Sequence, residues 1–466
     1  LGLRYCDVVS IVKRLGGGFG GKESQAAPFA AYAALVASKL KRPTRCVLTK
    51  DEDMKITGKR HPFKIYYEVG FDDKGLLIAL CAQIYSDGGA YTDLSPSILE
   101  RAMFHLDGAY YVPNIEIKAA ACRTNNHSNT AFRGFGAPQG NMAMESIMED
   151  IAIYLKKDSF LVRRANCYGT KERNMTPYGQ SVDNNQLPFL FDELYRISDY
   201  EKRSREIQAF NLEHSGKVRG ISMTATKFGI AFTARFLNQA NALVNVHVDG
   251  TVQVSTGATE MGQGVNTKLA QIVADTFGIS TTMVRVMPTS TEKNHNTSPT
   301  AASSGADLNG AAVLEAASKI KQRLQSLDKS LPWTDLIKKA YLERISLGEY
   351  AHYKTPGLDF DKDTAKGKAF NYFTMGTAVT EVEIDEYTGE NKVLRVDILM
   401  DVGRSLNTGI DRGQVIGAFT QAMGWVTTEK LVYDGKRHLL SHSPTTYKIP
   451  SVQDTPPVFN ISFIEN

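Results

Sequence analysis

The sequence lacks several features that would assign it to a class at once. It has no run of about 18 apolar residues, the length that a membrane-spanning helix needs. It opens at 1–4 without an initiator methionine or the apolar core of a signal peptide. Charge of one sign is also scarce, because 54 basic residues against 50 acidic ones leave a net charge of +4. We therefore expect neither a membrane protein nor a nucleic-acid partner.

Cysteine is sparse as well. The five cysteines are Cys6, Cys46, Cys81, Cys122 and Cys167. They stand at least 35 residues apart and form no C-x-x-C pair. An odd number of isolated cysteines argues against iron–sulfur clusters, structural zinc and a disulfide framework. We expect buried, reduced thiols in a cytoplasmic protein.

What is present indicates a globular chain of more than one domain. Hydrophobic residues make up 42% and charged residues 22%, which excludes a disordered chain, a collagen and a coiled coil. A length of 466 residues predicts two or more domains. The alternating pattern at 458–464 stops just before the last residues, and with the unusual start it predicts a piece of a longer protein.

The periodicity of apolar residues predicts a mixture of helices and hairpins. The expected strands are 8–15, 65–69, 76–84, 244–248, 252–255, 382–384, 393–400 and 458–464. The expected helices are 29–40, 144–155, 269–277 and 313–324. Hairpins mixed with helices favour an α+β fold over regular strand–helix alternation. A polar, turn-rich stretch at 166–188 divides the chain into domains 1–170 and 171–466.

Four loops rich in glycine or small residues each precede a helical pattern. They lie at 16–23, 133–136, 259–264 and 298–305. Each can present unpaired backbone N–H groups at the positive end of a helix. Because the loops are spread over both halves, we predict a large anionic ligand held by backbone contacts.

The first loop also fits two nucleotide-binding patterns in part. The G-x-G-x-x-G pattern of 16–21 matches a dinucleotide fingerprint, but 40–42, about 20 residues later, supplies no acid for a ribose. The G-x4-G-K pattern of 16–22 matches a P-loop, but Glu23 replaces the residue that binds magnesium and would repel a triphosphate. A nucleotide-binding P-loop protein is therefore an alternative, which nucleotide titration and metal analysis would distinguish.

Five segments in order resemble the molybdenum-binding part of the xanthine dehydrogenase/oxidase family. They are 16–23, 130–136, 257–264, 298–303 and 400–403, and they span nearly the whole chain. The resemblance implies two mixed α/β molybdopterin-binding domains, 1–170 and 171–466, each truncated at its outer end. It implies a molybdenum-molybdopterin cofactor. The implied reaction is hydroxylation of purines, from hypoxanthine through xanthine to urate, with oxygen derived from water.

The resemblance also implies roles for individual residues. Phe19, Arg133 and Ala302 are expected near the molybdenum, mainly through their backbone. The residues expected to hold the cofactor are Phe19, Gly20, Arg133, Gly262, Gln263, Thr300, Ala301, Ala302 and Ser303. The residues expected to contact the substrate are Glu23, Arg101, Phe135, Phe232 and Thr233, with Glu23 and Arg101 as the catalytic pair.

The chemistry of these side chains suits such roles. Two aromatic faces, Phe135 and Phe232, would hold a flat purine and leave its edges free for hydrogen bonds. Arg101 would stabilise the negative charge that develops on a distal oxygen in the transition state. Glu23 would accept a hydrogen bond at the other edge, or donate one when protonated. Ordinary roles also suit them, since aromatic rings fill cores and an acid is favourable in a first helical turn.

Other parts of the enzyme are expected outside this chain. Iron–sulfur clusters and FAD would lie on other domains or subunits, and an oligomer is expected. The general base of the family lies in a segment expected beyond Asn466, so we expect the chain alone to be inactive. Two alternatives are an aldehyde oxidase-type hydroxylase and a cofactor-binding fragment without turnover. The polar residues Glu23 and Arg101 favour purines, because aldehyde-oxidising relatives generally carry apolar residues there.

Overall fold

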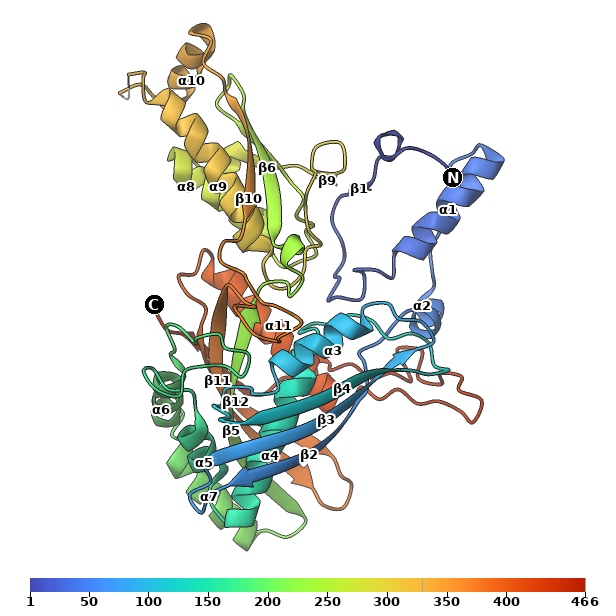
Figure 1. The fold of residues 1–466 in the computed structure, drawn as a ribbon, viewed down its shortest axis with the longest axis vertical. Coiled ribbons are helices and arrows are strands. Elements are labelled where there is room, and N and C mark those ends of the chain that lie inside the picture. Colours follow the sequence, from blue (N-terminus) through green and yellow to red (C-terminus); the bar gives the residue numbers. More distant parts are fainter. Residues whose placement is uncertain (329, 466) are drawn as a thin grey trace.

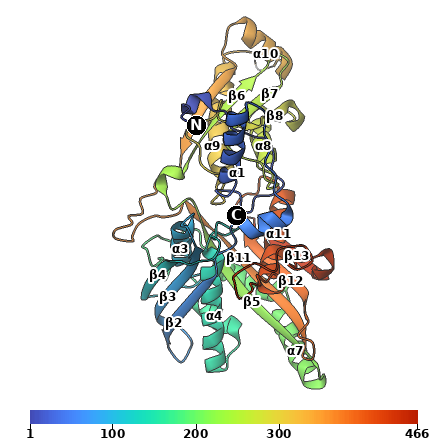
Figure 2. The same ribbon diagram turned by 90° about the vertical axis from the view of Figure 1, so that its right-hand side faces the viewer.

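The computed structural model describes residues 1–328 and 330–465. Two lobes are visible in Figures 1 and 2, the upper one formed by 239–354 and the lower one by most of the remaining chain. The N-terminal segment stands apart from the lower lobe (Figure 1). Sheets with mixed strand directions and helices packed on them form the α+β fold that the sequence predicted.

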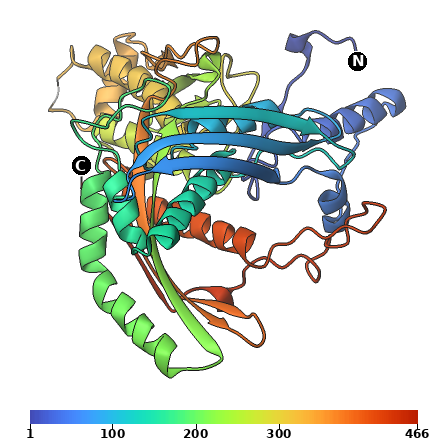
Figure 3. The ribbon, with the colours of Figure 1, turned by 60° about the horizontal axis from the view of Figure 1, so that its bottom comes forward.

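One sheet of the lower lobe has the order β2-β3-β4. Its strands are β2 (Phe63–Phe71), β3 (Leu77–Gly89) and β4 (Ile115–Arg123). The predicted hairpin is confirmed, because β2 and β3 pair antiparallel, while β4 runs parallel to β3. Helices α3 (Ser95–Phe104) and α4 (Ala137–Leu155) contact this sheet (Figure 3). The predicted helix at 144–155 lies within α4 and buries its apolar residues in the core.

A second sheet of the lower lobe has the order β13-β12-β11-β5. Its strands are β5 (Lys217–Ile230), β11 (Tyr372–Asp385), β12 (Asn391–Asp401) and β13 (Val458–Phe463). Nearby helices are α5 (Ser159–Asn166), α6 (Leu187–Ile197), α7 (Tyr200–Glu213) and α11 (Thr408–Val426). The largest core cluster joins both sheets, because Met223 and Met375 pack in it together with Met144 and Ile147.

The upper lobe has its own core. Its sheet, in the order β10-β6-β7-β8, consists of β10 (Gly348–Lys354), β6 (Gln239–Val246), β7 (Val252–Thr256) and β8 (Val284–Val286). The helices are α8 (Val265–Phe277), α9 (Gly305–Leu324) and α10 (Trp333–Leu342). The hairpin predicted between β6 and β7 is confirmed. The predicted end of α8 is confirmed too, because Gly278 caps the helix in the left-handed conformation at φ 72°.

The N-terminal segment departs from the sequence prediction. The expected strand 8–15 is wrong in extent: only β1 (Ile11–Val12) forms, and it pairs with β9 (Thr289–Ser290). Helix α1 (Ala27–Leu40) forms as predicted, but none of its residues is buried. The physical reason is that little protein packs against the segment, so its apolar pattern has no core to face (Figure 1). Helix α2 (Lys50–Ile56) follows and leads into the lower lobe.

The prediction of buried cysteines is wrong for most of them. Cys167 is buried, whereas Cys6, Cys46 and Cys81 are exposed and Cys122 is intermediate. All five thiols are free, as expected. Their exposure follows from their places on the N-terminal segment and on the outward-facing positions of β3 and β4. Among the residues that the structure describes, no helix is both long and apolar enough to cross a membrane.

Candidate functional site

The first glycine loop packs against the loop that leads into α4. The N–H of Arg133 donates to the carbonyl of Phe19 at 2.8 Å. Gly20 has φ 97°, and a β-carbon there would lie 2.9 Å from the carbonyl carbon of Ala131. A side chain is therefore excluded at this position, because the two backbones touch. Phe19, Gly20 and Arg133, predicted as cofactor neighbours, are brought together.

The same segment also meets the loops of the upper lobe. The N–H of Leu15 donates to the carbonyl of Glu260 at 2.9 Å. One residue earlier than Glu260, the N–H of Thr259 donates to the hydroxyl of Thr300 at 2.9 Å. Hydrogen bonds thus link the residue before the first predicted loop to the loop at 259–264, and that loop to the one at 298–305.

The N-terminus of α8 differs from the expectation of unpaired N–H groups. The buried carboxylate of Glu260 accepts the N–H groups of Gly262 at 2.8 Å, Gly264 at 3.0 Å and Asn266 at 3.0 Å. A carboxylate is favourable at the positive end of a helix, so a residue of the chain occupies the place expected for an anionic ligand. The Glu260 carboxylate therefore holds the conformation of this loop.

Gln263 and Gly262 have different roles in that loop. The side chain of Gln263 accepts from the N–H of Met261 at 2.6 Å and donates to the carbonyl of Thr259 at 2.9 Å. Gly262 has φ 100°, and no atom lies within 4 Å of the place where its β-carbon would be. The Gln263 side chain thus holds the loop, and no protein atom covers the Gly262 backbone on the side where a β-carbon would stand.

The loop before α9 keeps its N–H groups free. Ala302 and Ser303 both adopt left-handed conformations, with φ 54° and 57°. Among the described residues, no hydrogen bond uses the N–H groups of Ala302 or Ser303. Successive N–H groups in such a turn form a concave site for an anion. Among the loops predicted to hold the cofactor, this one fits a phosphate group best.

Arg133 also joins its loop to α11, a helix that the sequence analysis did not identify. Its guanidinium donates to the carbonyl of Gln414 at 2.9 Å, to the Gln414 amide oxygen at 3.0 Å and to the Gln421 amide oxygen at 3.2 Å. The missed signal is a row of glycines four residues apart at 409, 413 and 417. Such a row leaves one helix face bare, and the guanidinium lies against Gly417.

Arg60 is a second residue that the sequence analysis missed. Its guanidinium lies over the rings of Phe132 and Trp425, 4.1 and 4.7 Å from their centroids. It also donates to the carbonyl of Arg133 at 3.1 Å. Burial lowers the pKa of Arg60 to about 10, so the side chain stays charged at neutral pH. Arg60 therefore holds the backbone of the loop at the Arg133 carbonyl, while the Arg133 guanidinium binds α11.

Arg101 lies in α3 and is buried, with 3% of its surface exposed. Its guanidinium donates to the carbonyls of Ala231 and Gly229, both at 2.7 Å. The rings of Phe228 and Phe370 flank it at 4.8 and 4.9 Å. Burial lowers the pKa of Arg101 to about 10, which still leaves it positively charged at neutral pH. A fixed cation is thus placed at the end of β5.

The other predicted substrate residues surround α3. Thr233 donates to the carboxylate of Glu100, the neighbour of Arg101, at 3.0 Å. Phe232 is fixed by Asn238, which accepts its N–H and donates to its carbonyl, both at 2.9 Å. Phe135 has a left-handed backbone at φ 54° just before α4, the helix that packs on α3. Arg101, Phe232 and Thr233 are therefore brought to one place, and the loop of Phe135 borders it.

Glu23 lies beside the start of α3. Its neighbour Ser24 donates to the carboxylate of Asp93 at 2.7 Å, two residues before α3 begins. Glu23 keeps access to solvent, but the protein packed around its carboxyl raises the pKa, and the negative charge of Asp93 raises it further. Glu23 thus lies near the segment that leads into α3, and Arg101 lies in the last turn of that helix.

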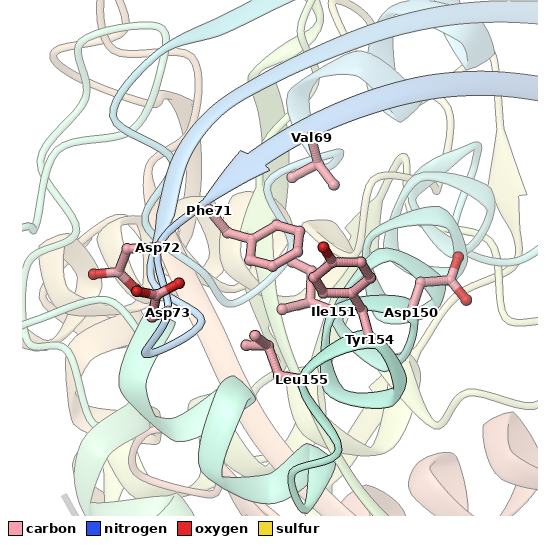
Figure 4. A pocket seen from close by; sticks show the side chains of 8 residues that line it. All are labelled: Val69, Phe71, Asp72, Asp73, Asp150, Ile151, Tyr154 and Leu155. Carbon is pink, nitrogen blue, oxygen red and sulfur yellow. The ribbon is translucent and has the colours of Figure 1, made fainter.

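A separate pocket of about 480 Å³ lies away from this site (Figure 4). It is bordered by the end of β2 and by the last turns of α4, and none of the predicted site residues lines it. Phe71 and Tyr154 face one another there, with ring centroids 5.6 Å apart.

Known protein families match most of this chain. Models of molybdopterin cofactor-binding domains match residues 1–167 and 193–456. The chain is 46% identical to xanthine dehydrogenase/oxidase of Mus musculus and 44% identical to xanthine dehydrogenase of Dictyostelium discoideum, over 100% of this chain in both cases. It spans 35% and 34% of the lengths of those relatives.

Solved structures show the same fold. Quinoline 2-oxidoreductase from Pseudomonas putida 86 superposes with a TM-score of 0.88 at 24% identity, over 98% of this chain and 62% of the other. Aldehyde oxidoreductase from Desulfovibrio gigas superposes with a TM-score of 0.88 at 22% identity, over 100% of this chain and 50% of the other. At these identities the likeness concerns the fold alone.

Proposed function

The chain belongs to the xanthine dehydrogenase/oxidase family, as its molybdopterin cofactor-binding part, and from this premise we propose that it forms the site of purine hydroxylation. The proposed reaction converts hypoxanthine to xanthine and xanthine to urate with oxygen derived from water. The observation that carries this proposal is the buried Arg101 guanidinium, held against the Gly229 and Ala231 carbonyls next to Phe232. A fixed cation at this point stabilises charge on the substrate's distal oxygen.

The cofactor would be held mainly by backbone groups. The N–H groups of Ala302 and Ser303 suit its phosphate, while Gly262 and the Phe19–Gly20 backbone border the space for the pterin. Thr300 and Ala301 support that cradle, since the Thr300 hydroxyl accepts from the neighbouring loop. When bound, the cofactor supplies a molybdenum centre that accepts two electrons.

The substrate would lie between aromatic rings with polar groups at its edges. Phe135 and Phe232 are the proposed faces, and Thr233 is a polar neighbour. Glu23 has a raised pKa, so its carboxyl stays protonated to higher pH than an ordinary glutamate and can donate a hydrogen bond to a ring nitrogen or oxygen. Arg101 would act at the opposite edge, where its charge favours the transition state over the ground state.

We propose further that this chain works together with other domains or subunits. Its curated relatives are about three times longer, since it spans 35% of the mouse protein. We therefore propose that electrons leave through iron–sulfur and flavin domains or subunits, in an oligomeric protein of the cytoplasm. We also retain 1–170 and 171–466 as the two cofactor-binding domains.

The test is substrate preference in the molybdenum-loaded protein that carries this chain. Metal analysis first establishes the molybdenum content, and a one-electron dye then serves as the acceptor. Urate formation from xanthine is compared with oxidation of an aromatic aldehyde under the same conditions. A higher kcat/KM for xanthine is expected. A clear preference for the aldehyde would overturn the purine proposal and favour an aldehyde-oxidising enzyme, and absence of turnover on both substrates would favour a cofactor-binding role.

A further inference from the structure

His105 lies directly after α3 and completes a closed set of hydrogen bonds around Arg101. The imidazole is buried, with 1% of its surface exposed. Its Nε2 accepts the N–H of Gly229 at 3.1 Å. Its Nδ1 lies 2.9 Å from the carbonyl of Arg101. Because an N–H can only donate and a carbonyl can only accept, the proton of the neutral ring lies on Nδ1.

Gly229 is held on both sides by this arrangement. Its N–H donates to His105, while its carbonyl accepts from the Arg101 guanidinium at 2.7 Å. A β-carbon at Gly229 would overlap the ring of Phe370, which also lies over the guanidinium. Glycine is therefore needed here for close approach, and the Gly229 carbonyl is one of the two carbonyls that hold the Arg101 guanidinium.

The surrounding charges keep His105 neutral. Burial, followed by the positive charges of Arg101 and Lys227, lowers the pKa of His105 well below its usual value. Lys227 itself is paired with the buried carboxylate of Asp107 at 3.1 Å. A neutral imidazole can accept from Gly229, whereas an imidazolium cannot. The charged neighbours thus favour the form of His105 that holds the Gly229 backbone.

The Arg101 guanidinium has more donors than the two hydrogen bonds that the structure describes for it. An arginine carries five N–H donors, and the structure describes one bond to Ala231 and one to Gly229. The Nε of Arg101 is buried without a partner among the described residues. A long side chain with free donors needs a fixed anchor if those donors are to meet one substrate atom.

We propose that His105 is a positioning residue, which acts through Gly229 to aim the Arg101 guanidinium at the substrate. The expected effect on xanthine turnover rests on the proposed function. The claim that His105 holds the Arg101 guanidinium in place does not depend on it. His105 does not touch the substrate. It sets the direction in which Arg101 presents its charge, and a displacement of about 1 Å at such a group can cost up to about a hundredfold in rate.

Two substitutions separate the hydrogen bonds from the volume of the ring. His105→Phe fills similar space but lacks both nitrogens. His105→Gln retains an oxygen that can accept from Gly229 and an amide N–H that can donate to the Arg101 carbonyl. His214→Ala is the matched control, because the His214 Nδ1 makes the same kind of bond to the carbonyl four residues earlier, at 3.0 Å, on the exposed end of α7. All variants are made in the molybdenum-loaded protein that carries this chain.

The kinetic outcome expected is specific to purines. For His105→Phe we expect kcat for xanthine to fall about tenfold while KM stays within about twofold, because a lost transition-state contact lowers kcat. Turnover of an aromatic aldehyde should stay within about twofold, as should both activities of His214→Ala. His105→Gln should recover xanthine turnover to within about threefold of the unsubstituted protein. In an Arg101→Met background, His105→Phe should cause no further loss.

Equal losses on xanthine and the aldehyde would overturn the inference, as would the same loss in the Arg101→Met background. A crystal structure of His105→Phe provides the geometric test: the guanidinium should leave at least one of the two carbonyls, and an unmoved guanidinium would also overturn the inference. If the guanidinium moves but Arg101→Met leaves xanthine turnover unchanged, the positioning role stands and the proposed role of Arg101 in purine hydroxylation fails.

Discussion

Replacement of Arg101 by methionine tests the substrate proposal most directly. Methionine has a similar length and can occupy the space between Phe228 and Phe370, but it removes the charge and every donor. Loss of one fixed donor to a developing negative charge costs about 3–4 kcal/mol, which is a hundredfold or more in rate. We therefore expect xanthine turnover to fall by at least about a hundredfold, with a much smaller effect on an aromatic aldehyde.

The structure also requires that a folding defect be separated from this effect. Arg101→Met leaves the carbonyls of Gly229 and Ala231 without the partners they have at 2.7 Å. Each unsatisfied buried group costs about 1–3 kcal/mol of stability. Rates must therefore be normalised to molybdenum content, and the thermal unfolding midpoint must be measured for each variant.

Matched substitutions make the result interpretable. Arg101→Lys keeps the positive charge, but its single ammonium group lacks the planar guanidinium geometry that binds two carbonyls at once. It should therefore recover only part of the xanthine turnover. Arg164→Met removes a surface arginine that pairs with Asp192 at 2.7 Å, and neither activity should change. Steady-state urate formation and aldehyde oxidation, with one dye as acceptor, provide the two rates. If Arg101→Met reduced both rates equally, the reason for preferring purines would be lost.

Three other predictions follow from charged side chains. Asp93→Asn removes a negative charge that raises the pKa of Glu23, so the limb of the kcat/KM profile that belongs to Glu23 should move to lower pH; an unmoved limb would mean that Glu23 does not titrate in catalysis. Lys227→Met leaves the Asp107 carboxylate buried without its partner and should lower the free energy of unfolding by about 3–5 kcal/mol. The thermal unfolding midpoint should fall, and adding Asp107→Asn should restore part of it. Glu260→Gln weakens three hydrogen bonds of a type worth about 1.5–3 kcal/mol each at the start of α8. It should lower the molybdenum content per chain, and an unchanged content would show that this loop does not shape the cofactor site.

Local rules explain which parts of the fold the sequence predicted. The hairpin between β6 and β7 follows from alternating residues around 249–250, where Thr251 donates its N–H to the Asp249 carboxylate at 2.9 Å. The end of α8 follows from Gly278, which adopts φ 72° at low cost. Both depend on residues within one turn of each other. The same rules predicted too long a strand at 8–15, because they contain no information on whether a partner strand is present.

For the site, the sequence by itself determined the residue types and the loops that carry them. A resemblance in five ordered segments identified Glu23, Arg101, Phe135 and Phe232 without any knowledge of their contacts. The pattern of glycine-rich loops led to the expectation of free N–H groups before α8, which is wrong for the three N–H groups that donate to Glu260. The spacing of glycines shows that backbone can approach closely, but not which group approaches.

Only the tertiary structure decided how those residues are aimed. The Arg101 guanidinium meets carbonyls 128 and 130 positions further along the chain, and Arg133 meets a helix 281 positions away. No periodicity near Arg101 or Arg133 indicates these partners, because the partners lie at the end of β5 and on α11, which are remote in the sequence. The physical reason is that a buried charge or peptide group must be paired by whatever the fold brings within about 3 Å, and the sequence near that group does not specify the neighbour.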